Sequence, residues 1–306
     1  MNHDFHDARA RVLVCGVGAV GCEALEKVAL SLGDAAATLW LDAEDVAGLP
    51  PSPLTVCIRL NAAAADDEAL FLAGTCAQRD QMEDALRQAD LLIVLADLGS
   101  AMGRGATKAL FAIAGDHLFA TVACVVLPEA DHGAPRVASA LAALDEIAHD
   151  VDAYLSVREG RIRDLPEDAP ARTPGAVFAE AVCALARPIL FPAAVPLDFA
   201  DIMVFLKGSG RIAIGIGRAS GENRAVEAAE SAVAFPLLGR AALACAERTL
   251  LIVHGGSDLE MKELMALSTY VKTIITKDSR LLIGVELDDE PCPVVEFSIL
   301  CAAGET

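Results

Sequence analysis

The first half of the chain alternates short apolar runs with segments of helical periodicity. The predicted strands are residues 11–17, 37–41, 91–96 and 119–127. The predicted helices are residues 19–32, 104–114, and either one long helix or two shorter ones over residues 66–89. Strands that alternate with helices are typical of a doubly wound, mostly parallel α/β sheet, in which ligands bind at the carboxyl ends of the strands.

The second half has a different rhythm. A charged, proline-rich stretch at residues 161–174 separates it from the first half, and a core helix at residues 175–186, ended by Pro188, follows. The predicted elements after that are a helix from Asp198, strands at 211–216 and 249–254, helices at 223–235 and 259–271, and hairpin-capable strands at 281–287 and 293–300. We therefore expect three parts: a nucleotide-binding-type domain at 1–160, a loop with the central core helix at 161–195, and a smaller α+β domain at 196–306.

Composition excludes several classes of protein. A formal net charge of −20 argues against nucleic acid and against direct binding to an anionic membrane. No apolar run is long enough to cross a bilayer and no signal peptide is visible, so we expect a soluble, cytoplasmic protein without direct membrane insertion. The nine cysteines occur singly, which argues against a metal site or a disulfide framework. Those expected to be small buried hydrophobes are Cys15, Cys57, Cys124, Cys183 and Cys301.

The first glycine motif, VCGVGAVGCEALEKV, lies between a strand and a helix. Its glycines are Gly16, Gly18 and Gly21, and Asp42 follows about 20 residues later, as in the dinucleotide-binding fingerprint. The motif alone predicts NAD, because such a turn lets a pyrophosphate approach a helix N-terminus. The alternative is that the glycines serve only close packing. An adenylating enzyme of the ubiquitin-activating type has a similar motif, but no later residue supports that reading.

Three later stretches carry a more specific signal. They are PLDFADI at 196–202, AIGIGRASGENRAVEAAESAVAFPLL at 213–238 and LLIVHGGSDLEMKEL at 250–264. They closely resemble the FtsZ family of the tubulin superfamily, and the resemblance runs from about residue 11 to residue 304. It implies a GTP-binding first half, a core helix that includes residues 175–186, and subunits that stack head to tail with GTP at their interface.

In the family, carboxylates from the loop after the core helix polarise water against the neighbouring subunit's γ-phosphate. The resemblance assigns this role to Asp198 and Asp201, although Pro196 replaces the family's preceding Asn. Capping is the alternative, because Asp198 is a natural N-cap and Asp201 lies at the positive end of the same helix. For residues 213–238, local rules predict Ser220 as the N-cap and Glu222 in the first helical turn.

The family's phosphate signature, GGGTGTG, reads GSAMGRG here. Gly99, Gly103 and Gly105 are retained, whereas Ser100 and Ala101 replace glycines and Met102 and Arg104 replace threonines. Losing two hydrogen bonds to a charged group, each worth ~1.5–3 kcal/mol, weakens binding by roughly a hundredfold or more. We expect Arg104 to pair with a phosphate, with Glu23, or with a carboxylate of the next subunit.

Two further contacts of the family's nucleotide site change here. Val20 and Glu23 stand in the first glycine loop, where Glu23 would repel phosphate. Gly175 and Ala176 align with the pair that reads guanine in the family. We therefore expect weak binding of GTP or GDP, and hydrolysis that is weakened or lost.

The sequence thus predicts an FtsZ-like cytoskeletal subunit that self-assembles head to tail into filaments. The alternative is an active GTPase, completed at the subunit interface, that acts in cell division or membrane remodelling; an NAD-binding enzyme is a third reading. Because the chain stops at Thr306, just past the last predicted strand, we expect no flexible C-terminal tail. The partners left open, besides the chain itself, are another FtsZ and a membrane-associated adaptor.

Overall fold

The computed structural model describes residues 10–42, 55–60, 67–87, 89–115, 120–165, 167 and 169–302. Three residues at the ends of predicted segments, Asp66, Phe119 and Gly304, lie outside these ranges.

Ten described strands form one sheet, in the order β3-β2-β1-β4-β5-β6-β7-β10-β8-β9. All neighbouring strands are parallel except β10, which runs antiparallel to both β7 and β8. The strands are β1 (Val12–Val17), β2 (Ala37–Asp42), β3 (Thr55–Arg59), β4 (Leu91–Asp97), β5 (Ala120–Leu127), β6 (Ala153–Arg158), β7 (Gly210–Ser220), β8 (Arg248–Gly255), β9 (Arg280–Leu287) and β10 (Val294–Ala302). The mostly parallel α/β prediction is confirmed.

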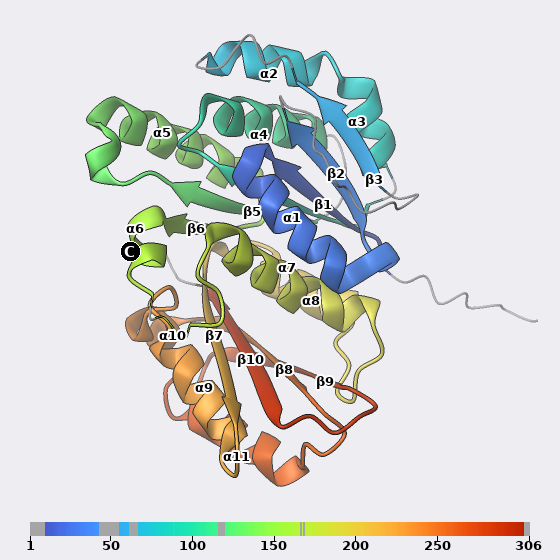
Figure 1. The fold of residues 1–306 in the computed structure, drawn as a ribbon, viewed down its shortest axis with the longest axis vertical. Coiled ribbons are helices and arrows are strands. Elements are labelled where there is room, and N and C mark those ends of the chain that lie inside the picture. Colours follow the sequence, from blue (N-terminus) through green and yellow to red (C-terminus); the bar gives the residue numbers. More distant parts are fainter. Residues whose placement is uncertain are drawn as a thin grey trace, which may run out of the picture.

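Helices cover both faces of this sheet (Figure 1). They are α1 (Gly18–Leu32), α2 (Glu68–Cys76), α3 (Arg79–Leu86), α4 (Ala101–Ala114), α5 (Ala134–Asp150), α6 (Glu159–Arg163), α7 (Pro174–Leu190), α8 (Phe199–Leu206), α9 (Arg224–Ala234), α10 (Arg240–Cys245) and α11 (Met261–Lys272). Helices α1, α7 and α8 share one apolar core with the strands, and α2 to α5 share a second core on the opposite face. A third core joins α9, α10 and α11 to the C-terminal strands.

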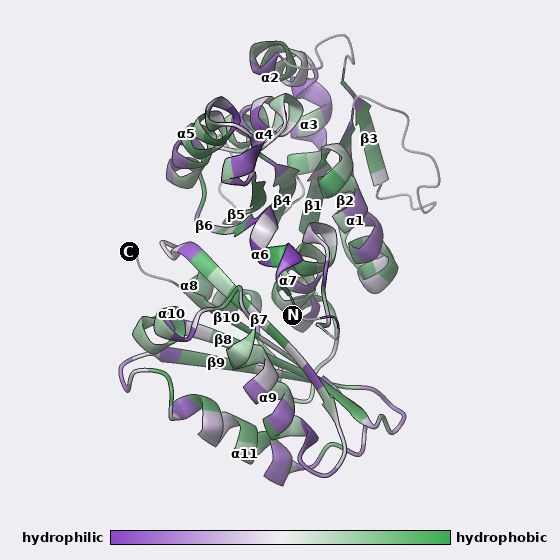
Figure 2. Cartoon of the chain, turned by 60° about the vertical axis from the view of Figure 1, so that its left-hand side comes forward, coloured by the Kyte–Doolittle hydropathy of each residue, from purple (hydrophilic) through white to green (hydrophobic). Residues whose placement is uncertain are grey.

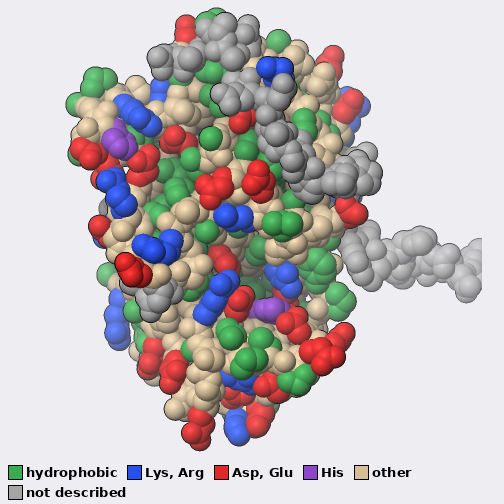
Figure 3. Space-filling view, viewed as in Figure 1, with side chains coloured by type: hydrophobic (Ala, Val, Ile, Leu, Met, Phe, Trp, Pro, Cys, Tyr) green, Lys and Arg blue, Asp and Glu red, His purple; other side chains and the backbone are tan. Residues whose placement is uncertain are grey.

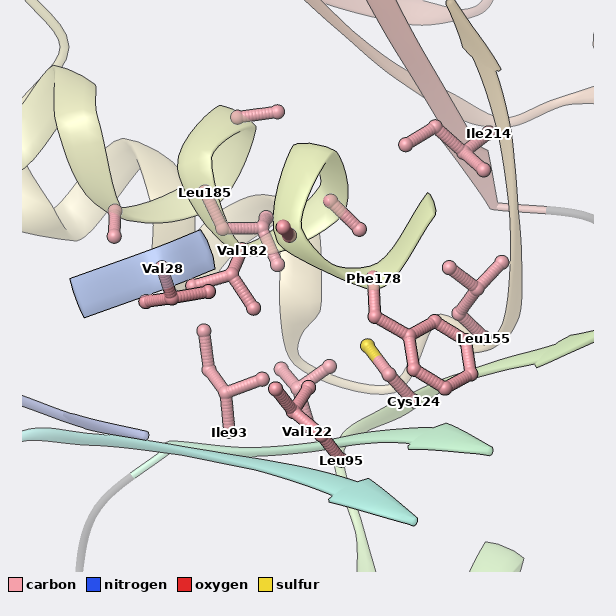
Figure 4. Close-up of a cluster of buried hydrophobic side chains, with 14 of the residues drawn as sticks. Val28, Ile93, Leu95, Val122, Cys124, Leu155, Phe178, Val182, Leu185 and Ile214 are labelled. Carbon is pink, nitrogen blue, oxygen red and sulfur yellow. The ribbon is translucent and has the colours of Figure 1, made fainter. Parts of the chain in front are cut away.

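The first half follows directly from its apolar runs. Strands β1 and β5 are buried at every position, as expected for parallel strands covered on both faces. Successive residues of a strand point to opposite faces, so Val14 joins the core with α1 and α7 while Leu13 joins the core with α4. Figure 4 shows Phe178, Val182 and Leu185 of α7 among side chains of the strands. Helix α7 is therefore the central core helix.

The second half continues the sheet through a short seam. Strand β7 pairs with β6 only from Gly210 to Ile212, and pairs with β10 along Ile212–Ser220. The GIG stretch of β7 allows α9 to pack closely, because a Cβ on Gly217 would lie 1.9 Å from the Ala228 carbonyl oxygen. The motif that carries the family resemblance thus has a direct packing role.

Ion pairs join α7 to the C-terminal strands. Arg187 Nε lies 2.8 Å from Glu286 Oε2 on β9, and Glu180 Oε1 lies 2.8 Å from Arg218 Nη2 on β7. Arg218 Nε also lies 2.9 Å from Glu296 on β10. In the view of Figure 3, acidic and basic side chains are mixed across the lower part of the molecule. The core helix is therefore tied to the second half by charge as well as by apolar contacts.

Several element predictions are wrong, for local reasons. The last two strands are not a hairpin, because β10 lies between β7 and β8 while β9 pairs with β8. Helix α7 continues through Pro188 to Leu190, since the hydrogen bond that proline cannot donate belongs to the last turn of the helix. Helix α9 is preceded by Asn223 at its N-cap, so Ser220 ends β7 and Glu222 precedes the helix.

The sequence analysis missed five elements: β3, α5, β6, α6 and α10. The helix predicted at residues 104–114 was too short. Helix α4 begins at Ala101, because Ser100 caps it. Residues 66–89 contain two helices, α2 and α3, which was one of the two alternatives.

The cysteines are all free. Cys15, Cys124 and Cys301 are buried as expected. Cys57 is exposed on β3, which is an edge strand among the described strands, and Cys183 is half-buried. No described helix is both long and apolar enough to cross a membrane. The described residues contain no group of three or more His, Cys, Asp or Glu side chains arranged to hold a metal ion.

Candidate functional site

The turn from β1 to α1 contains the first three glycines of the candidate site. A Cβ on Gly16 would lie 2.6 Å from the Gly21 carbonyl oxygen, and one on Gly21 would lie 2.2 Å from the Leu95 carbonyl oxygen. These two glycines therefore let α1 pack against β1 and β4. Gly18 differs, because its φ of +66° is a left-handed conformation that favours glycine at the start of the helix.

An apolar side chain lies over this turn. The Met102 methyl carbon is 2.8 Å from the position that a Cβ on Gly18 would take. Met102 belongs to the first turn of α4 and packs against the core on that side of the sheet. A thioether cannot donate a hydrogen bond, so the space between the two glycine segments presents no donor from this residue to an anion.

The segment from Asp97 to Gly103 binds its own polar groups. The Gly99 N–H donates to Asp97 Oδ1 at 2.7 Å, and the Gly103 N–H donates to Ser100 Oγ at 2.9 Å. Burial raises the pKa of Asp97, and the Gly99 N–H and Arg136 act to lower it. Two backbone donors that a phosphate could use are thus already satisfied, one of them by a carboxylate of the same chain.

The glycines of this segment have packing roles. A Cβ on Gly103 would lie 1.8 Å from the Asp97 carbonyl oxygen, and one on Gly105 would lie 2.4 Å from the Glu68 carbonyl oxygen. Both belong to α4 rather than to a loop. Gly105 lets α4 pack closely against α2, so its presence does not require a ligand.

Arg104 pairs within its own chain. Its Nε lies 2.6 Å from Glu68 Oε2, and its Nη1 donates to the Leu98 carbonyl at 3.0 Å. Burial acts to raise the pKa of Glu68, but hydrogen bonds from Arg104 and Lys108 outweigh it and leave that pKa below its ordinary value. The prediction that Arg104 pairs with Glu23 is therefore wrong, because its carboxylate partner within the chain is Glu68 on α2.

Glu23 lies at the other side of the glycine turn, against the start of α7. Its Oε1 accepts a hydrogen bond from Thr173 Oγ1 at 2.9 Å, and its Cδ is 2.9 Å from the position of a Cβ on Gly175. The Thr173 hydroxyl in turn accepts from the Ala176 N–H at 3.0 Å. A carboxylate at a helix N-terminus is favourable, so Glu23 stabilises the very segment that aligns with the guanine-reading pair.

Arg136 is the cation that sequence reasoning missed. It lies in the first turn of α5, and its Nη2 is 2.8 Å from the position of a Cβ on Gly99. No glycine or spacing pattern points to it, because α5 itself was not predicted. The Arg136 guanidinium faces Gly99 and gives the site a group suited to a phosphate.

Asp42 ends β2 beside α1. A hydrogen bond joins it to Cys22. The pKa of Cys22 is raised to about 12, mainly by burial and next by the nearby Asp42 carboxylate. The carboxylate that an NAD-binding reading assigns to a ribose hydroxyl is thus engaged with a buried thiol.

Asp198 and Asp201 form a reciprocal capping box at the start of α8. The Asp201 N–H donates to Asp198 Oδ1 at 2.8 Å, and the Asp198 N–H donates to Asp201 Oδ2 at 3.2 Å. The capping alternative therefore describes their contacts within one chain. Whether they also act on a neighbour stays a prediction.

The two candidate half-sites lie beyond opposite ends of α7. Glu23 and Gly175 mark its start, and Asp198 follows its end at Leu190. Seventeen helical residues span roughly 25 Å, so one chain does not bring the aspartates to the glycine segments. A second copy is needed to join them.

Comparison with known proteins gives one family and a set of similar structures. Residues 210–303 match the C-terminal domain of the FtsZ family. An empty FtsZ dimer from M. jannaschii has a TM-score of 0.85 at 20% identity, covering 97% of this chain and 89% of that chain. CetZ2 from Haloferax volcanii, in a GTPgS-bound protofilament, has a TM-score of 0.73 at 18% identity, covering 95% and 92%.

CetZ from Methanosaeta thermophila is similar as well, with a TM-score of 0.76 at 14% identity over 95% of this chain and 86% of that chain. Identities this low establish the fold alone. The chain therefore has the FtsZ fold through its described residues, and its residues 210–303 match the C-terminal domain of the FtsZ family.

Proposed function

We propose that this protein is a cytoplasmic cytoskeletal subunit that self-assembles head to tail into filaments, with GTP binding and hydrolysis weakened or lost. The observation that carries the proposal is the position of the two half-sites beyond opposite ends of α7. Parts of one site at opposite ends of a chain favour a heterologous contact, and a heterologous contact that does not close generates a filament. The FtsZ dimer and the CetZ2 protofilament among the similar structures support self-association.

The intrachain contacts of the loop support a weak nucleotide site. Asp97 accepts a hydrogen bond from the Gly99 N–H, and Ser100 accepts one from the Gly103 N–H. The Met102 side chain lies over Gly18. A phosphate would have to displace these groups and approach a carboxylate. The proposed division into parts at 1–160, 161–195 and 196–306 assigns this site to the first part and Asp198 with Asp201 to the third.

Arg136 favours the second candidate, an active GTPase. Its guanidinium faces Gly99, and a bidentate contact to a phosphate would offset part of the loss. CetZ2 bound to GTPgS and CetZ1 bound to GDP are among the similar structures. In this reading Asp198 and Asp201 act in the neighbour's site.

Electron microscopy of the purified protein separates the two candidates. Samples at matched concentration, without nucleotide and with GTP and magnesium, are compared by negative stain. Filaments in both support the first proposal. Filaments only with GTP, together with GTP turnover that rises steeply with protein concentration, would replace it with the second.

A further inference from the structure

A groove opens where β6 and β7 separate, on the same side of the sheet as α5. The two strands pair only over three residues, Ala153–Leu155 with Gly210–Ile212, before β7 turns to β10. The groove has a volume of about 470 Å³. Figure 2 shows β6 and α6 between α5 and the C-terminal strands. The lining of the groove includes none of the residues of the glycine segments.

The wall of the groove combines polar and apolar surface. Tyr154 and Ser156 point to this side, because alternate residues of β6 face α5 while Leu155 and Val157 belong to the core with α7. The apolar residues that line it on this side or at its edge are Leu127, Leu141, Leu144, Pro236 and Leu237. Leu141 is 41% exposed, so the rim offers apolar surface to a ligand.

Three arginines also line the groove, and no carboxylate among the described residues does. Arg161 donates a hydrogen bond to the Pro236 carbonyl, which joins α6 to the segment after α9. Arg158 and Arg211 are exposed and, within the described part of the chain, form no ion pair. By contrast, Arg104, Arg187 and Arg224 are all paired with carboxylates.

This concentration of positive charge is unusual for a chain with 44 acidic and 24 basic residues. Acidic side chains are abundant enough to neutralise these arginines, yet none lines the groove. The net charge of −20 repels long polyanions such as nucleic acid. A short acidic segment experiences less of this repulsion while gaining both the arginines and the apolar wall.

We propose that this groove binds an acidic peptide segment of a partner protein. Carboxylates of the segment pair with Arg158 and Arg211, and leucine-type side chains pack on the wall beside Leu141. The proposal is independent of filament formation and of nucleotide binding, since the groove shares no residue with either half-site.

The test is fluorescence anisotropy with the full chain and a short fluorescein-labelled peptide of alternating glutamate and leucine. The groove variant is Arg158→Gln with Arg211→Gln, and the matched control is Lys277→Gln with Arg280→Gln, which removes the same charge from an exposed site outside the groove. We expect the peptide to bind wild type and control alike, and the groove variant about tenfold more weakly. Circular dichroism verifies that both variants are folded.

Two further probes make the outcome specific. A peptide with glutamine in place of glutamate tests charge, and one with serine in place of leucine tests apolar contact; both are expected to bind about tenfold more weakly. Equal binding by wild type and groove variant, or by the glutamate and glutamine peptides, would overturn the proposal. So would a change in self-assembly caused by the groove variant without any effect on peptide binding, because the occupant would then be a second copy.

Discussion

Asp97 shows how a single residue can decide whether a glycine-rich segment is open to phosphate. Its carboxylate accepts the Gly99 N–H, and burial raises its pKa, so the cost of keeping it charged is only partly offset by its partners. Met102 adds a methyl group over Gly18. Together they place a charge and an apolar group where an incoming phosphate would need donors.

Replacing both residues should therefore improve nucleotide binding. In the variant Asp97→Asn with Met102→Thr, the asparagine oxygen still accepts the Gly99 N–H, the charge is removed, and the threonine hydroxyl becomes a donor. We expect GTP affinity to rise by at least about tenfold, measured by isothermal titration calorimetry. Met265→Thr on exposed α11 is the control, with no change expected. An unaltered affinity in the double variant would show that these residues do not limit binding.

His254 on β8 is the second residue with a measurable consequence. The Glu296 carboxylate, 3.8 Å from Nδ1, raises the pKa of His254 most, burial opposes this, and Asp288, 3.1 Å from Nε2, adds to it. A histidine with a raised pKa stabilises the folded state below its unfolded pKa, and this contribution is lost as the pH rises through the folded pKa. His254 therefore links β8 to β10 more strongly in acid.

The expected result is a difference in pH dependence between two variants. His254→Gln removes the part of the stability that is lost as the pH rises above 6.5, the ordinary pKa of histidine. The thermal midpoint of this variant should therefore fall less than that of wild type as the pH rises above this value. His149→Gln, on the exposed end of α5, should keep the wild-type dependence. Thermal melts followed by circular dichroism check this, and parallel curves for wild type and His254→Gln would contradict it.

At the scale of elements, the sequence was most informative where one local signal dominates. The apolar runs of β1, β4 and β5 and the helix-period pattern of α1 could be read directly, because burial on both faces leaves little ambiguity. Strand β3 was missed because it is short and half-exposed. The order of β9 and β10 could not be read at all, since pairing partners depend on tertiary packing rather than on local pattern.

The candidate site was predicted only in part, for the same reason. Glycine spacing located Gly18 and Gly99, but the partners of Arg104 and Glu23 lie far away in the chain, on α2 and at the start of α7. Asp97 and Arg136 were missed because no sequence pattern predicts which side chain of a neighbouring element will contact a loop. Spacing finds where the backbone turns, and only the fold shows which charges gather there.

The contact between α2 and α4 gives an element-scale prediction. Gly→Ala inside a helix usually stabilises a protein by about 0.5–1 kcal/mol, but a Cβ on Gly105 would lie 2.4 Å from the Glu68 carbonyl oxygen. We expect Gly105→Ala to lower the free energy of unfolding by about 2 kcal/mol, because the two helices must move apart. Gly74→Ala is the matched control: Gly74 lies in α2 with nothing within 4 Å of a new Cβ, so it should stabilise. Urea denaturation measures both, and the same sign for the two variants would refute the packing argument.

At the scale of the whole molecule, the relevant feature is its polarity. Helix α7 runs across the longest axis, which has α2 at one end and α11 at the other (Figure 1). The half-site with the glycine segments lies beyond the start of α7, and the one with Asp198 and Asp201 lies beyond its end. A head-to-tail stack that joins the two half-sites would therefore run along α7.

This polarity predicts a mixing experiment. Arg136→Glu should block assembly at the half-site with the glycine segments, and Asp198→Arg with Asp201→Arg should block it at the other half-site, so that neither variant alone forms filaments. Met265→Glu, 65% exposed on α11, is the control and should assemble normally. Because each blocked variant keeps one intact end, an equimolar mixture should form dimers but no filaments, since the two intact ends complement each other only once. Analytical ultracentrifugation distinguishes these species. Dimers in either variant alone would indicate a symmetric contact instead, and filaments in either one would place the interface elsewhere on the molecule.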